Sequence, residues 1–171
     1  SFLPSPFLFI AGSFAFFLII SDATLRQLYI VGIVLLYYFI LRNIFSFLYQ
    51  SDSYQPYALE NIYSYVNMVS LYLFYSALYG MRLFLSWPHW VGVAAAFILT
   101  MVLLARTFWS YKIPWQQSRL YIIIISIVVA QGYYAIGLLP TSFILNGFIV
   151  IILYYILINL AKDILREAFD R

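Results

Sequence analysis

The chain contains no cysteine among its 171 residues. This absence excludes disulfide bonds, metal sites built on thiolates and catalysis by a cysteine nucleophile. Histidine is almost as scarce, because His89 is the only one, and a single imidazole needs further ligands to hold a metal ion. The sequence therefore predicts no metal centre and no bound cofactor.

Charge is the second deficiency, since Asp, Glu, Lys and Arg make up only 9% of the chain. A soluble domain carries about 25% charged residues. Hydrophobic residues reach 65%, which is more than a chain of this length can bury in its own core. The nine basic residues are scattered, which argues against nucleic acid as a partner. We therefore expect an integral membrane protein whose first partner is the lipid bilayer.

Apolar runs divide the sequence into six segments near the length of a membrane-spanning helix, which needs roughly 20 residues. The first run is short, and the third is long enough to project past the hydrocarbon. Runs such as YIIIISIVV show no alternation of polar and apolar residues, so barrel strands are not favoured. We predict an all-α polytopic transmembrane helix bundle, a single domain over 1–171, with spans at 4–20, 25–41, 56–85, 91–108, 120–139 and 142–161.

The basic residues orient these six spans, because cytoplasmic loops carry an excess of Lys and Arg. Only Arg26 and Arg82 fall on one side of the predicted bundle. The other side collects the remaining seven: Arg42, Arg106, Lys112, Arg119, Lys162, Arg166 and Arg171. This distribution predicts that the N- and C-termini are both cytoplasmic.

The last ten residues, 162–171, read as an amphipathic cytoplasmic tail that continues the sixth helix. Arg166 and Asp170, like Glu167 and Arg171, are four residues apart, the spacing at which helical side chains pair. We expect this tail to dock either on the loop between the fourth and fifth spans or on a partner protein.

Tyrosine is abundant, with 17 residues, and not all of them can lie at the membrane interface. Tyr37, Tyr38, Tyr72 and Tyr75 fall near the middle of their predicted spans. A buried phenol needs a hydrogen-bond partner. We therefore predict that these four side chains face other helices.

The third span holds the densest set of polar residues, with Glu60, Ser64 and Asn67 on one helical stripe. A polar stripe should face the bundle interior, because lipid leaves it unsatisfied. Two interpretations stay open: a polar cavity that opens toward the cytoplasm with Glu60 as its acid, or hydrogen bonds that hold neighbouring helices together.

Two amides, Gln131 and Asn146, flank the turn around Pro140. Pro140 disfavours helical geometry in the residue before it, so the fifth and sixth spans should form a hairpin. The two amides then lie at similar depth, and we predict that they hydrogen-bond across that hairpin, with a substrate contact as the alternative.

Catalytic signatures are missing from the chain, which has no GxSxG, P-loop, HExxH or GxGxxG motif. The acids outside the tail, Asp22, Asp52 and Glu60, lie in or beside predicted loops on different membrane faces. General acid–base catalysis needs a matched and positioned pair. The sequence therefore argues against an enzyme.

The stretch LLPTSFILNGFIVIILYY resembles an uncharacterised family of small polytopic membrane proteins from candidate-phyla bacteria. The likeness lies in an LP-x-S-[FY]-x-x-N-G turn, at 139–147, that leads into the last apolar helix. The resemblance implies a bacterial protein of about six helices, and it implies no activity and no catalytic residues.

Together these features predict a non-catalytic integral membrane protein that acts as a structural, assembly or interaction component. The alternative is a small-molecule transporter or a solute-binding membrane subunit, and a membrane-embedded enzyme is a third class. The expected location is the bacterial cytoplasmic membrane. A protein partner, a homo-oligomer or a small-molecule ligand is compatible with each of the first two functions.

Overall fold

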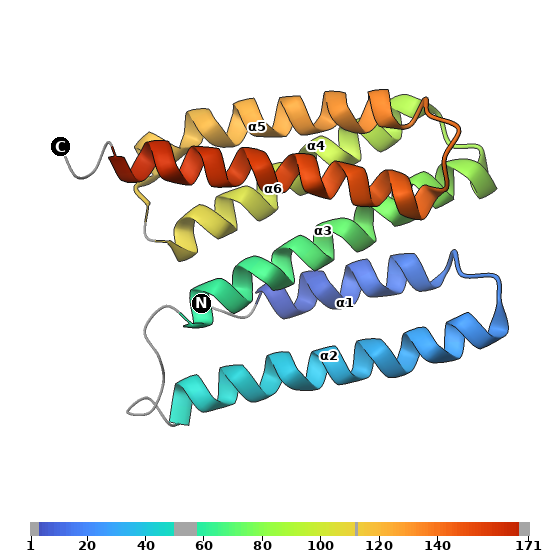
Figure 1. Cartoon of the computed structure of the whole chain (residues 1–171), viewed down its shortest axis with the longest axis horizontal. Coiled ribbons are helices and arrows are strands. Elements are labelled where there is room, and N and C mark those ends of the chain that lie inside the picture. Colours follow the sequence, from blue (N-terminus) through green and yellow to red (C-terminus); the bar gives the residue numbers. More distant parts are fainter. Residues whose placement is uncertain (1–3, 50–57, 112, 168–171) are drawn as a thin grey trace.

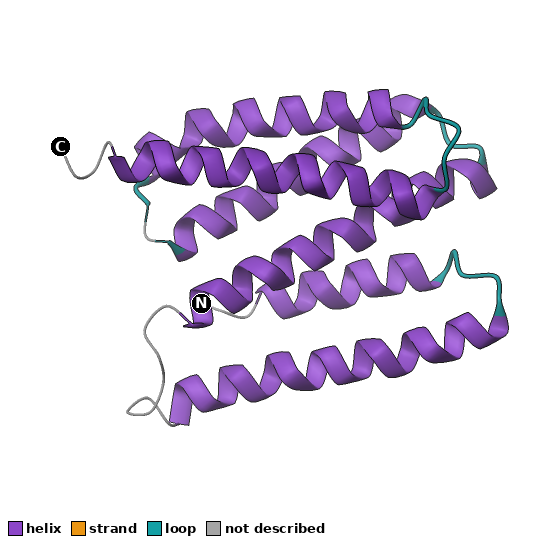
Figure 2. Ribbon diagram, viewed as in Figure 1, coloured by secondary structure: helices purple, strands orange, loops and turns teal. Residues whose placement is uncertain are grey.

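The computed structural model describes residues 4–49, 58–111 and 113–167, and within these ranges it contains helices and short connections but no strand (Figure 2). In chain order the six helices are α1 (Pro4–Phe17), α2 (Ala23–Tyr49), α3 (Ala58–Leu85), α4 (His89–Ser110), α5 (Trp115–Ile136) and α6 (Phe143–Glu167) (Figure 1). The predicted all-α fold is therefore confirmed for the described part of the chain.

Five helices, α2 to α6, are long and apolar enough to cross a membrane. The apolar α1 has 14 residues, a length of ~21 Å, which is less than the ~30 Å of a bilayer core. Many large apolar side chains are exposed, including Leu28 of α2 and Leu83 of α3. Lipid rather than water must cover these side chains, so the chain is an integral membrane protein.

Several helices extend past the apolar runs that predicted them. Helix α2 continues to Tyr49 instead of ending near 41, and α5 begins at Trp115 instead of 120. Polar residues in these extensions do not stop a helix when they are satisfied locally, as where Asn43 Nδ2 donates to Phe39 O at 2.8 Å. Helix α6 likewise runs to Glu167, while 168–171 of the predicted tail lie outside the described residues.

Helix α3 is the centre of the arrangement, with α1 and α2 on one side and α4, α5 and α6 on the other (Figure 1). It packs against α1, α4 and α6, and α5 fills the remaining place between α4 and α6. The larger core cluster joins α3 to α6 through residues such as Leu71, Leu103, Val129 and Val150. A second cluster joins α1 and α2 to the opposite face of α3.

Helix α2 is the least buried of the long helices, because only 6% of its membrane-length segment is buried, compared with 50% for α3. Its main polar link is Tyr29 Oη, which donates to Ser13 O of α1 at 3.1 Å. The prediction that Tyr38 faces another helix is wrong, since its side chain is exposed. The neighbouring Tyr37 takes the inward position and packs against the second cluster.

Close approach between α3 and α6 depends on Gly147. A Cβ atom at this position would overlap Ser76 Oγ and lie 3.0 Å from the backbone nitrogen of Ser76. Because the obstacle includes backbone, the helices themselves would have to separate. Gly32 of α2 offers the opposite environment, since a Cβ there meets nothing within 4 Å.

We therefore expect Gly147→Ala to lower the free energy of unfolding by about 1–3 kcal/mol, the usual cost of overpacking. The matched control Gly32→Ala should be neutral or slightly stabilising, because Ala is the better helix former. Thermal unfolding of both variants in detergent measures the difference. Equal effects at the two positions would contradict the close α3–α6 contact.

Candidate functional site

The polar stripe predicted on the third span lies against α4. Asn67 is buried, and its Nδ2 donates to Thr107 Oγ1 at 3.2 Å, while Thr107 Oγ1 donates in turn to Leu103 O at 2.8 Å. Ser64 is half-buried one turn below. Glu60 belongs to the first turn of α3, but its side chain lies outside the described part of the structure. The described portion of the stripe thus provides a hydrogen bond between α3 and α4.

Two tyrosines extend this pattern along α3. Tyr75 is fully buried, and its Oη lies 2.7 Å from Thr100 Oγ1 of α4. One turn later, Tyr79 Oη donates to Tyr133 O of α5 at 2.5 Å, and the rings of Tyr79 and Tyr133 stack with centroids 4.2 Å apart. Helix α3 is therefore bonded through side chains to both α4 and α5.

The structure does not bring the two predicted amides together. Asn146 is buried near the start of α6, and its Oδ1 accepts a hydrogen bond from Thr141 Oγ1. Gln131 is exposed on α5, and within the described ranges no hydrogen bond joins it to Asn146. Equal depth in two adjacent helices does not make two side chains meet, because each helix also has a rotation about its axis.

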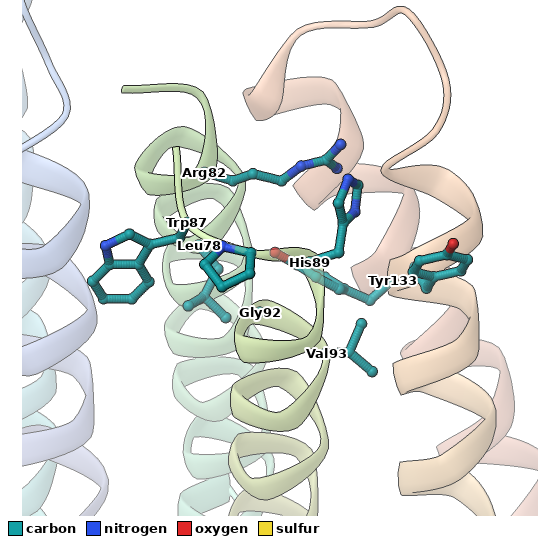
Figure 3. Close-up of a pocket in the computed structure, with 9 residues that line it drawn as sticks. Leu78, Arg82, Trp87, His89, Gly92, Val93 and Tyr133 are labelled. Atoms are coloured by element: carbon teal, nitrogen blue, oxygen red, sulfur yellow. The ribbon is translucent and has the colours of Figure 1, made fainter. Parts of the chain in front are cut away.

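A small cavity lies where α3, α4 and α5 come together near the 86–88 connection (Figure 3). We call it the Arg82 cavity and define it by Leu78, Arg82, His89, Gly92 and Tyr133, with Trp87 and Tyr134 at its rim. Its volume is about 10 Å³, close to the smallest space that holds one water molecule. Figure 3 shows Arg82 from α3 and His89 from α4 extending toward the same region.

Arg82 is held in place by the C-terminal end of α5. Its Nη1 donates to Gly137 O at 2.9 Å, and a Cβ at position 137 would lie only 3.0 Å from that nitrogen. The last carbonyls of a helix lack partners within the helix and carry partial negative charge, so a cation there is stabilised. One nitrogen of the guanidinium is thus fixed to α5, and the group retains further N–H donors.

Tyr133 gives the cavity its most unusual atom. The residue is 4% exposed, and its Oη is a buried atom without a hydrogen-bond partner. A Cβ at position 92 would lie 2.8 Å from this Oη, so Gly92 leaves the space into which the phenol points. A buried hydroxyl without a partner is destabilising, and Tyr133 Oη shares this state with three other buried side-chain atoms of the described residues, Asn67 Oδ1 among them.

A larger groove adjoins the cavity on the outer surface of α4 and α5. This α4–α5 groove has a volume of about 820 Å³ and is lined mainly by apolar side chains, among them Trp90, Ala94, Phe97 and Ile127. The exposed Gln131 is its polar member along the wall. The groove and the Arg82 cavity share His89, Val93 and Tyr134, so the two spaces are adjacent at one end.

From the sequence alone, Arg82 served only to orient the bundle and His89 stood out only as the single histidine, and neither was placed beside Tyr133. In the structure His89 is the first residue of α4 and is half-buried, with its ring edge-on to Tyr134. One signal in the sequence could have identified Arg82. An arginine inside an apolar span costs free energy in a membrane, so its presence there indicates a binding partner or a function. Among the described residues no group of His, Asp and Glu could hold a metal ion.

Comparison of the chain with protein-family models, with curated proteins and with solved structures found no match. The described residues form an all-α protein of six helices, five of which are long and apolar enough to span a membrane. The family resemblance of residues 139–147 stays a prediction.

The bond from Tyr79 to α5 makes a measurable contribution to stability. We expect Tyr79→Phe to lower the free energy of unfolding by about 0.6–1 kcal/mol, near the average for such bonds in membranes. The loss should be modest because Tyr133 O also accepts from Gly137 N at 3.0 Å. Tyr155→Phe, at an exposed position of α6, is the control and should leave the melting temperature in detergent unchanged. A neutral Tyr79→Phe would contradict this role.

Proposed function

We propose that this chain is a non-catalytic integral membrane protein with a structural, assembly or interaction role. The observation that supports the proposal most directly is the use of buried polar groups. Asn67, Tyr75 and Tyr79 of α3 each bond to a neighbouring helix rather than line a solute-sized space, and Arg82 bonds to the end of α5. Such bonds fix helices relative to one another and suit a rigid membrane component.

The proposed topology has six spans with both termini in the cytoplasm, in a bacterial cytoplasmic membrane. Its support is the grouping of charges: Arg42, Arg106, Arg119 and Lys162 lie toward one end of the bundle, where α2, α4 and α6 end and α5 begins (Figure 1). The tail region contributes a further contact there, because Lys162 Nζ lies 4.0 Å from the ring centroid of Tyr111. The bacterial assignment rests on the resemblance of residues 139–147.

The lack of cysteine makes this topology simple to test, since each introduced cysteine is the only thiol. In intact cells a membrane-impermeant maleimide should label Ser21→Cys, in the exposed α1–α2 connection, but not Gln116→Cys at the start of α5. Ser1→Cys should react only after permeabilisation if α1 crosses the membrane. Labelling of Ser1→Cys in intact cells would remove the sixth span, and labelling of Gln116→Cys would invert the orientation.

The alternative function is binding or transport of a small solute, and the α4–α5 groove is the observation that favours it. Its lining is mainly apolar, so it suits an amphiphile better than a hydrophilic metabolite. A thermal-shift screen of water-soluble metabolites on the purified protein should therefore produce no change in melting temperature. A saturable shift that Gln131→Leu abolishes, and that Gly32→Ala retains, would favour the solute-binding function instead.

A further inference from the structure

We propose that the Arg82 cavity and the α4–α5 groove form one binding site for an anionic membrane lipid. An anionic oxygen of the headgroup enters the cavity, and one acyl chain lies in the groove. This inference goes beyond the structural role proposed above. It does not depend on that role, because it requires only that α4 and α5 are in contact with lipid.

The charge of the headgroup follows from the polar groups that line the cavity. Arg82 can only donate hydrogen bonds, and it has no ion pair with a carboxylate among the described residues. His89 adds a ring N–H, and Tyr133 adds a buried Oη that has no partner. No carboxylate lines the cavity to compete for these donors. A set of donors around one cation matches an anionic oxygen, with which charge-assisted hydrogen bonds are strong.

The size of the cavity limits how much of the headgroup can enter. A volume of about 10 Å³ accommodates roughly one water-sized group, so it holds a single oxygen atom rather than a whole phosphate. The rest of the headgroup then lies beside Trp87 and Trp90, which are exposed at the same end of the bundle. Tryptophan favours the depth of lipid headgroups. The site should therefore distinguish lipids by negative charge and not by the detailed structure of the headgroup.

The apolar part of the ligand follows from the groove. Its volume of about 820 Å³ falls in the range of roughly 300–1,000 Å³ that is typical of ligand sites. Because His89, Val93 and Tyr134 line both spaces, the groove begins beside the cavity, and a ligand with its oxygen in the cavity would have its acyl chain at the start of the groove. The exposed amide of Gln131, which hydrocarbon would leave without a partner, can donate to an ester carbonyl of the same lipid.

Lipid binding can be measured by native mass spectrometry of the full chain in detergent, titrated separately with phosphatidylglycerol and phosphatidylcholine. We expect one phosphatidylglycerol molecule to bind on the order of tenfold more tightly than phosphatidylcholine. Arg82→Gln should remove this preference. The matched control is Arg26→Gln, which removes an exposed guanidinium that also donates to a carbonyl, Ile20 O at 2.6 Å, but lies outside the site. Equal weakening by the two variants would overturn the proposal in favour of general charge attraction.

Two further pairs of measurements keep the test independent of folding. Tyr133→Phe removes a buried oxygen that has no partner in the protein, so it should lower phosphatidylglycerol affinity several-fold without lowering the melting temperature. Ala94→Phe fills the groove and should weaken binding of both lipids, whereas Val102→Phe, on the exposed surface of α4, should not. Retention of full affinity in both Tyr133→Phe and Ala94→Phe would overturn the site.

The source of the anion is tested by competition. Inorganic phosphate at the same concentration should not displace phosphatidylglycerol, because it lacks the acyl chain that fills the groove. Displacement at equal concentration would show that the cavity binds free anions and that the groove has no part in recognition.

Discussion

The helix bundle depends on α3, which lies between α1 and α2 on one side and α4, α5 and α6 on the other (Figure 1). The surrounding lipid does little to drive these two groups of helices together. Within a bilayer, apolar surface gains little by leaving lipid for another helix, so close packing and interhelical hydrogen bonds must hold the bundle together. Helix α3 provides both. On one face it bonds through side chains to α4 and α5. On the other, Gly12 of α1 comes so close that a Cβ there would lie 3.2 Å from Ser70 O.

The two faces of α3 are not equally strong. Toward α4, α5 and α6 the contacts combine an extensive apolar cluster with four polar links from α3. Toward α1 and α2 the apolar cluster is smaller, and the described polar link between α1 and α2 is Tyr29 with Ser13. Local opening follows the regions with the fewest buried contacts. Helix α2, of whose membrane-length segment only 6% is buried, is therefore the part of the described structure whose position is least constrained by its own chain.

The number of helices and their approximate positions could be predicted from the sequence, because each helix contains an apolar run whose length is near that needed to cross a bilayer. The ends of the helices could not, since a helix such as α2 continues beyond the hydrocarbon for as long as residues like Asn43 satisfy themselves on its own backbone. The expectation that Gln131 and Asn146 meet was based on their similar distance from Pro140, and that distance does not fix the rotation of each helix about its axis. The position of Arg82 depends on a backbone carbonyl, Gly137 O. Every residue has a backbone carbonyl, so the sequence does not indicate which one accepts this hydrogen bond.

Helix α1 has a consequence for the membrane around the protein. At 14 residues, or ~21 Å, its apolar length is less than that of the hydrocarbon beside it, whereas the adjacent α2 and α3 have 27 and 28 residues. If α1 crosses the membrane as proposed, the bilayer beside it must thin, or polar flanking groups must reach outward, and either response costs energy for each ångström of mismatch. A bilayer thin enough to match α1 is then thinner than the lengths of α2 and α3, which must tilt or project past it. In a membrane of uneven thickness, such a protein would favour the orientation that places α1 on the thinner side.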